Sequence, residues 1–255
     1  MNKTELLFYD AYEEFYSMAN QSQTFRLFCR DAFGEDMSQD GFSDLSQIDR
    51  IVQYIPAGTK ARILDIGCGN GKMLGYLQGR TGACIYGFDY SGQAIRAAKA
   101  HYPVDSQFRE GIIGEIEYPQ KHFDVITSMD SMYFAKDMTK FTAQIKGWLK
   151  DDGIFFTGYQ EGDVIPKTDG IETAWLTLAL QENDMPYEVI DITEQTYTML
   201  RKKRETALAY QTDFESEGHK RWFDMLMLQT ECVEEPYEEF SQKMARYIYI
   251  ARKRI

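Results

Sequence analysis

The sequence predicts an α/β protein with a doubly wound, seven-stranded and mainly parallel sheet, an N-terminal helical flap, and a helical lid inserted before the last strand. Three observations predict this fold. Short apolar runs of strand length alternate with segments of helical period, which is typical of βαβ units. A glycine-rich turn follows the first apolar run. The helical stretch over residues 194–245 is too long to be a plain connection between the last two strands.

The chain begins with an aromatic segment. Residues 4–19 carry apolar side chains on overlapping helical stripes, which predicts a flap that packs on the main domain. Its tyrosines, Tyr12 and Tyr16, could also line a pocket for a cationic group, because aromatic faces attract cations. A loop over residues 34–41, which includes Gln39, precedes a lead-in helix over residues 45–55.

The first strand, residues 61–66, runs into the glycine turn. Gly67, Gly69 and Gly71 alternate, and Asp65 lies two residues before the first of them. Glycine supplies the backbone angles of a tight turn and lets a ligand lie against bare main chain, while the following helix N-terminus favours anions. A dinucleotide site has G-x-G-x-x-G spacing, which differs from the spacing here. A purely structural turn is the alternative interpretation.

A second strand over residues 83–89 ends in Asp89 and is followed by a helix over residues 91–100. An acid at the carboxyl end of a second parallel strand can accept hydrogen bonds from ribose hydroxyls. Taken alone, Asp89 could equally be a helix-capping residue. Together with the glycine turn, it predicts a nucleoside-binding site.

The fourth strand, Phe123–Met129, is followed directly by Asp130. Ligands of open α/β sheets bind outside the carboxyl ends of the strands, so Asp130 is predicted to lie in the active site. The alternative is a helix or loop cap.

Apolar runs of strand length and apolar stripes of helical period also predict the remaining elements. These are a third strand at 106–111, a helix from Phe141 to Leu149 ended by residues 150–153, a fifth strand at 154–159, a helix with Ile171, Trp175, Leu178 and Ala179 on its apolar stripe, a sixth strand at 187–192 and a last strand at 246–252. The predicted units are the flap and lead-in helix (1–57), the core (58–193), the lid (194–245) and the final strand (246–255).

Composition narrows the classes of function. The chain has 255 residues and a net charge of −12, which argues against a nucleic-acid partner. Its one basic run, Arg201–Arg204, is surrounded by acids and is predicted to be a solvated helix face. The cysteines and histidines lack metal-ligand spacing, so no metal is predicted. Neither a signal-peptide apolar region nor an 18-residue apolar run is present, which predicts a cytoplasmic protein without membrane contact. A monomer or homodimer is expected.

The pattern Asp65-x-Gly67-x-Gly69-x-Gly71, joined to Asp89, resembles the first motifs of class I S-adenosylmethionine-dependent methyltransferases. The run from Trp148 through Gly153 into a strand is similar to the same family. The resemblance implies a Rossmann-like core and S-adenosyl-L-methionine as cofactor, with S-adenosyl-L-homocysteine as product. The cofactor-binding positions implied by the resemblance are Asp65, Gly67, Cys68, Gly69, Gly71, Asp89, Tyr90, Ile112, Ile113 and Met129. Ile112 replaces an Asp that often meets the adenine amino group, and Ile113 could supply an apolar wall.

The flanking segments resemble small-molecule amine methyltransferases of the sarcosine/dimethylglycine and phosphoethanolamine types. The resemblance implies a small-molecule acceptor and gives Asp130 the place of an active-site acid. Phe134 stands where the phosphoethanolamine enzymes have a histidine, and no basic cluster for a phosphate is present, so that substrate is not expected.

The predicted function is therefore methylation of an amine, with Asp130 and Tyr16 as the catalytic candidates. Four alternatives remain open. They are an O- or C-methyltransferase of a biosynthetic intermediate, a non-catalytic protein that binds the cofactor, an NAD-dependent enzyme, which the glycine spacing disfavours, and a nucleic-acid methyltransferase, which the charge disfavours.

Overall fold

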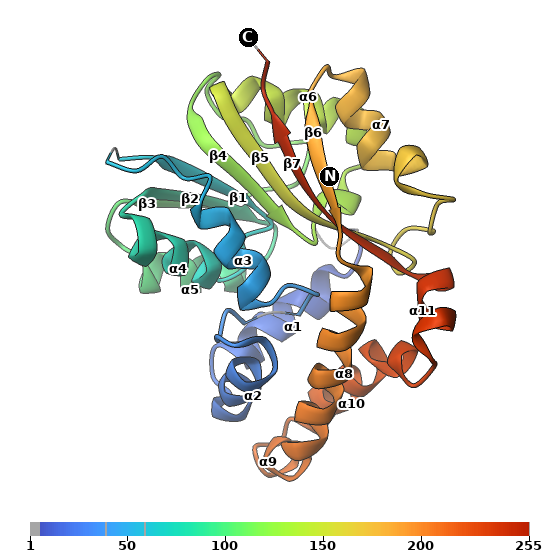
Figure 1. Cartoon of the computed structure of the whole chain (residues 1–255). Helices are drawn as coiled ribbons and strands as arrows, with labels where there is room; N and C mark the ends of the chain where they lie inside the picture. The colour runs from blue at the N-terminus through green and yellow to red at the C-terminus, as the bar shows by residue number, and fades with distance from the viewer. Residues whose placement is uncertain (1–5, 39, 59, 255) are drawn as a thin grey trace.

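The computed structural model describes residues 6–38, 40–58 and 60–254. Its centre is one seven-stranded sheet in the order β3-β2-β1-β4-β5-β7-β6 (Figure 1). The last strand, β7, pairs antiparallel with both neighbours, and the other pairs are parallel, which confirms the predicted fold class. The strands are β1 (Arg62–Ile66), β2 (Cys84–Asp89), β3 (Ser106–Glu110), β4 (Phe123–Met129), β5 (Leu149–Glu161), β6 (Tyr187–Asp191) and β7 (Ala245–Arg252).

Helices cover both faces of the sheet, as a doubly wound fold requires. One face is packed by α3 (Leu45–Val52), α4 (Lys72–Thr81) and α5 (Gly92–His101), whose apolar side chains share a core with those of the central strands. The other face is packed by α6 (Met138–Trp148) and α7 (Trp175–Glu182), which form a second core. The carboxyl ends of the parallel strands stay uncovered by these two layers.

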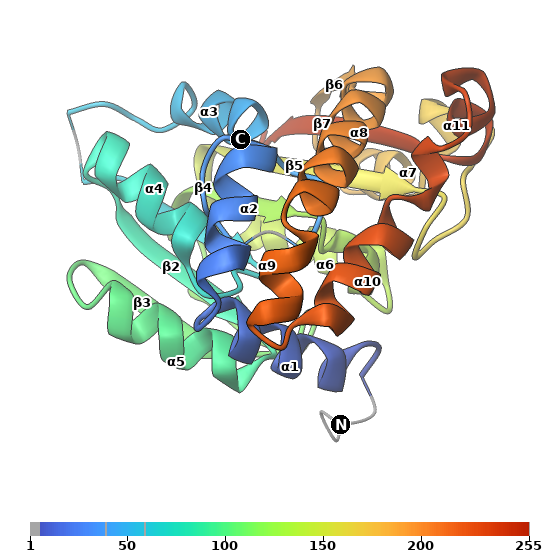
Figure 2. The same ribbon diagram turned by 90° about the horizontal axis from the view of Figure 1, so that it is seen from below.

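The flap and the lid cover those strand ends together. The flap consists of α1 (Tyr9–Ala19) and α2 (Gln23–Phe33). The lid consists of α8 (Thr193–Ala209), α9 (Gln211–Ser216), α10 (Lys220–Gln229) and α11 (Tyr237–Lys243). Figure 2 shows α1, α2, α8, α9 and α10 gathered on one side of the sheet.

A third hydrophobic core joins the flap to the lid. Its buried members include Phe15 and Phe28 from the flap and Leu200, Phe214 and Phe223 from the lid. The aromatic side chains of the flap pack on the lid through this core and also on the main domain, as predicted, since the rings of Tyr9 and Tyr12 contact that of Tyr90. Residues 1–5 and Gln39, which belong to the predicted flap and its loop, lie outside the described residues.

The predicted start of the fifth strand is wrong. Strand β5 begins at Leu149, which pairs with Phe123, so the predicted break at 150–153 lies inside the strand. Asp152 adopts φ 62° there, and a non-glycine residue in this left-handed region bends the chain locally. Sequence turn signals cannot distinguish such a bend within a strand from a loop between elements.

The predicted apolar stripe of α7 is right at Ala179, which is buried, and wrong at Trp175 and Leu178. Trp175 and Leu178 are 45% and 49% exposed, whereas Leu176 and Leu180 are fully buried. Residues Ile171–Thr173 form a separate 3₁₀ turn, η3, so the true helix starts four residues later than predicted. Apolar residues occur on every side of this helix, so its sequence offers two apolar stripes, and the one that faces the core carries Leu176, Ala179 and Leu180. Within the described residues, no helix is long and apolar enough to cross a membrane.

Candidate functional site

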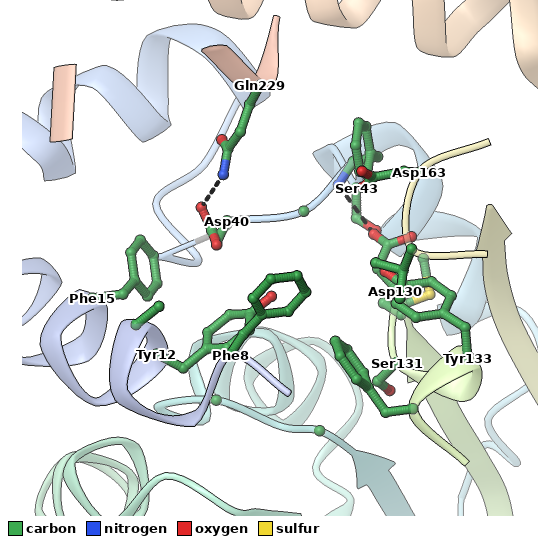
Figure 3. A pocket seen from close by; sticks show the side chains of 18 of the residues that line it. Phe8, Tyr12, Phe15, Asp40, Ser43, Asp130, Ser131, Tyr133, Asp163 and Gln229 are labelled. Atoms are coloured by element: carbon green, nitrogen blue, oxygen red, sulfur yellow. Dashed lines mark hydrogen bonds between the residues drawn. The ribbon is translucent and has the colours of Figure 1, made fainter. Parts of the chain in front are cut away.

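A cavity of about 900 Å³ lies at the carboxyl ends of the strands, between the sheet, the flap and the lid (Figure 3). This volume suits a small-molecule site. Its wall is formed by the glycine turn, the ends of β2 and β4, the loop between α2 and α3, helix α1 and the lid. The predicted site residues that line it are Tyr16, Asp65, Gly67, Cys68, Gly69, Asp89, Tyr90, Ile113, Met129 and Asp130.

The glycine turn needs its first two glycines. Gly67 and Gly69 adopt φ 71° and 51°, in the left-handed region that glycine tolerates. A side chain on Gly67 would come within 2.8 Å of the Cβ atom of Ser131. The amides of Gly67 and Cys68 both donate to the carbonyl of Phe88, at 2.9 and 3.0 Å, which ties the turn to β2.

Two predicted cofactor contacts, Gly71 and Ile112, are absent from the described residues that line the cavity. Gly71 is the N-cap of α4 with φ 79°, and a side chain there would come within about 3 Å of Phe108 and Ala98. Its role in this structure is close packing. Ile112 uses its carbonyl to accept hydrogen bonds from Glu115 and Ile116. Its neighbour Ile113 lines the cavity instead.

Asp89 bridges the turn and the next helix. Its Oδ2 accepts the Gly69 amide at 3.0 Å, and its Oδ1 accepts the Ser91 amide at 2.8 Å. The N-cap of α5 is Ser91, whose hydroxyl accepts the amide of Ala94, so Asp89 is not that helix's cap. Carboxylate oxygens accept more than one hydrogen bond each, so this side chain can also receive ligand hydroxyls.

Asp65 is a buried acid beside Asp89. Burial raises the pKa of Asp65 to about 8, and the charge of Asp89 adds to this, while a 2.7 Å hydrogen bond from Thr127 opposes it. A carboxyl group with this pKa ionises more readily when a cation approaches. Asp65 therefore favours a cationic group at this end of the cavity.

Asp130 adopts φ 60° directly after β4, and its carboxylate is strongly engaged. Both terminal guanidinium nitrogens of Arg246, Nη1 and Nη2, donate to it, and the Arg246 side chain is fully buried. It also accepts the Phe42 amide and the Ser43 hydroxyl, each at 3.1 Å. Arg246 reaches Gln47 at 3.1 Å as well. Asp130 therefore ties the loop before α3 to strand β7.

The sequence interpretation missed Arg246. The available signal was a lone cation in an otherwise apolar run, Ala245–Ala251, since a buried arginine needs an acidic partner. Periodicity cannot identify that partner, because Asp130 lies far away in the chain.

Two flap tyrosines lie over the turn. A side chain on Gly69 would collide with the Tyr16 hydroxyl, so this ring sits directly against the glycine backbone. Tyr12 stacks on Tyr16 with ring centroids 6.4 Å apart. Burial raises the pKa of both phenols, with smaller contributions from Asp40 and, for Tyr16, from Asp89. Both tyrosines are therefore neutral hydrogen-bond donors near pH 7, not proton acceptors.

The cavity is strongly acidic. Among the described residues that line it, lysine and arginine are represented by Lys243 alone. The carboxylates of the lining are Asp40, Asp65, Asp89, Asp130, Asp163, Glu231, Glu234 and Glu235. Such a lining concentrates cations and repels anions.

Known proteins resemble this chain over most of its length. The methyltransferase domain family matches residues 44–223, more than half of the chain. A tRNA U34 carboxymethyltransferase of Pseudoalteromonas translucida is 27% identical over 175 residues, which are 62% of this chain and 54% of the relative. A ubiquinone biosynthesis O-methyltransferase of Neisseria meningitidis is 27% identical over 106 residues, 37% of this chain and 42% of the relative.

A solved structure shares the fold. It is a phosphoethanolamine N-methyltransferase 2 of Haemonchus contortus in complex with phosphomonomethylethanolamine and S-adenosylhomocysteine. It superposes with a TM-score of 0.76 at 16% identity, over 98% of this chain and 61% of that one. The chain thus spans about half the length of the curated relatives it matches and less than two thirds of this structural neighbour.

Proposed function

The chain belongs to the methyltransferase domain family of class I S-adenosylmethionine-dependent enzymes, and from this premise we propose that it methylates the nitrogen of a small-molecule amine. The acidic cavity supports this proposal most directly. Eight carboxyl groups line it, beside the rings of Tyr12 and Tyr16. Asp65 is largely protonated near pH 7, and three others form ion pairs with Arg246, Arg204 and Lys243, so about half of the eight contribute a full negative charge to the cavity. Carboxylates and aromatic faces together attract cationic groups.

The residues at the strand ends suit the cofactor. Asp89 can receive the ribose hydroxyls, and Phe88 and Ile113 offer apolar surface to the adenine ring. Asp65 and the bare backbone of Gly67 can receive the amino-acid end. When bound, S-adenosyl-L-methionine supplies a methyl group already activated by its sulfonium.

In the proposed reaction an acceptor that binds as an ammonium would first release a proton to solvent. The lone pair of its nitrogen would then form the new N–CH₃ bond as the S–CH₃ bond breaks, with the electrons of the broken bond staying on sulfur. A proton left on the product ammonium goes to solvent. Because the donor is already activated, the protein's task is alignment and exclusion of water. Tyr16 and the flap cover the reacting centre, and Asp130 positions the loop that carries Phe42 and Ser43.

Other acceptors are less well supported. The relatives include a tRNA-modifying enzyme and an O-methyltransferase, so family membership alone selects neither the substrate class nor the atom methylated. The acidic lining disfavours a nucleic-acid acceptor, because phosphates are repelled there. A cofactor-binding protein without transferase activity is the alternative outside catalysis. Cytoplasmic localisation and a monomeric or homodimeric state remain predictions from the sequence.

The test has two stages. Calorimetric titration with S-adenosylmethionine, S-adenosylhomocysteine and NAD identifies the cofactor, with Asp89→Ala as the variant expected to lose binding. Transfer of a labelled methyl group is then measured across matched amines and alcohols of equal carbon skeleton. Turnover with amines supports the proposal. Turnover with alcohols alone, or binding of NAD alone, contradicts it.

A further inference from the structure

Asp40 lies in the loop between α2 and α3 and projects into the cavity. Figure 3 shows its carboxylate between Gln229 above and Tyr12 and Phe8 below. Gln229 belongs to α10 of the lid, and its Nε2 donates to Asp40 Oδ1 at 2.9 Å. The other carboxylate oxygen, Oδ2, accepts no hydrogen bond from the described residues. One oxygen is therefore fixed by the lid, and the second can receive a ligand.

A buried lysine holds Gln229 in this orientation. Lys203 Nζ donates to the Gln229 amide oxygen at 2.9 Å, which forces the NH₂ group toward Asp40. Lys203 is fully buried, although the sequence predicts its segment to be a solvated helix face. Its ammonium lies 5.9 Å from the ring centroids of both Phe33 and Phe42. The series Lys203–Gln229–Asp40 thus joins α8, α10 and the loop.

Most other carboxylates of the cavity already have a role. Asp65 and Asp89 lie at the glycine turn, and Asp130 is paired with Arg246. At the rim, Glu234 pairs with Arg204 and Glu235 pairs with Lys243.

The remaining carboxylates of the cavity are Asp40, Asp163 and Glu231. Asp163 and Glu231 are exposed to solvent, which weakens their attraction for a ligand. Asp40 is partly buried and is held by a side-chain amide. Of these three carboxylates, Asp40 is the best placed to bind a cation.

We propose that Asp40 anchors the cationic group of the acceptor, with the tyrosines of α1 as the aromatic wall and with Lys203 and Gln229 as positioning residues. The inference rests on the proposed amine methylation and deepens it. It assigns acceptor binding to the flap–lid side of the cavity, away from the carboxylates at the strand ends.

Tetramethylammonium and its uncharged counterpart tert-butanol serve as probes, because the acceptor is unidentified. Each is titrated into the S-adenosylhomocysteine complex of the full chain. The wild type should bind tetramethylammonium more tightly than tert-butanol. Asp40→Asn should weaken the cation about tenfold, because the partly buried carboxylate charge that faces the ammonium is removed, and should leave S-adenosylhomocysteine affinity unchanged. Asp163→Asn is the matched control, because it removes the same charge from the same cavity, and its loss should be smaller.

A second variant tests the positioning role. Gln229→Leu keeps the Asp40 charge but releases its orientation, so it should weaken tetramethylammonium by an intermediate factor without changing S-adenosylhomocysteine affinity. Equal losses in Asp40→Asn and Asp163→Asn would overturn the inference, because only the general charge of the cavity would then matter. A loss of S-adenosylhomocysteine affinity in Asp40→Asn would assign Asp40 to the cofactor and also overturn it. If the wild type binds no S-adenosylhomocysteine, the proposed function itself fails.

Discussion

Replacing Asp130 by Asn should destabilise the fold by about 3–5 kcal/mol, because removal of one partner from a buried ion pair leaves the other charge uncompensated. The side chain of Arg246 is fully buried and that of Asp130 is 7% exposed, so water cannot take over the lost interaction. Asparagine has nearly the size of aspartate, but it places an uncharged amide beside the guanidinium of Arg246. The loop amide of Phe42 also loses a charged acceptor.

Urea unfolding followed by tryptophan fluorescence measures this loss. With an m value of about 3 kcal/mol/M, the expected shift of the midpoint is about 1 to 1.7 M. The double variant Asp130→Asn/Arg246→Met should be more stable than the sum of the single losses predicts, because it leaves no buried charge unpaired. Asp163→Asn, an exposed acid of the same cavity, should change stability by less than about 0.5 kcal/mol.

A loss below about 1 kcal/mol for Asp130→Asn, with strict additivity in the double variant, would refute the reasoning. Asp130 would then not be the residue that anchors the loop. A large loss of methyl-transfer activity without any loss of stability would favour a direct contact of Asp130 with the acceptor or the cofactor, which is the role that the sequence predicts for it.

Three further predictions follow from the site and the core. Asp65 has a raised pKa of about 8, so the folded state binds a proton that the unfolded chain releases near pH 4, and apo stability should fall as pH rises from about 4 to 8. Asp65→Asn should remove that slope in melting curves and leave a variant that is relatively more stable above pH 8; an unchanged slope would place the titration elsewhere. Gly69→Ala should weaken S-adenosylhomocysteine by more than about tenfold through collision with Tyr16, and adding Tyr16→Ala should restore only part of the affinity in calorimetry, because the positive φ of this position still disfavours a side chain. Trp175→Ser should cost less than about 0.5 kcal/mol in urea unfolding, against about 2–5 for Leu180→Ala; the reverse order would restore the predicted face of α7.

Most of the fold can be predicted from patterns within short stretches of the sequence. The apolar runs, the glycine turn and Asp89 lie close together in the chain, so spacing alone predicts a strand, a turn and a nucleoside-sized site at the sheet edge. The cavity brings ten of the predicted site residues to one place. Gly71 is the instructive exception, because the same motif that suggests ligand contact also serves helix packing against Phe108.

The sequence does not predict which residues interact when they lie far apart in the chain. The partner of Asp130 is Arg246, and Lys203 reaches Gln229 only because two lid helices cross. A charged run on a helix normally faces water, and nothing in its own composition indicates that one member is enclosed. The face of α7 was misjudged for a similar reason, since burial depends on what packs against the helix.

The shared core of flap and lid also bears on how the protein is made. The aromatic residues of α2, which ends at Phe33, share this core with Leu200 and Phe214 of the lid, which come much later in the chain. At about 5–20 residues per second, a ribosome needs roughly 10 to 40 seconds to supply them. During that interval the apolar side chains of α2 lack the lid residues that bury them in the folded protein. Nascent copies of this protein should accordingly need protection from premature association, and truncation within the lid should leave the flap exposed to aggregation and proteolysis.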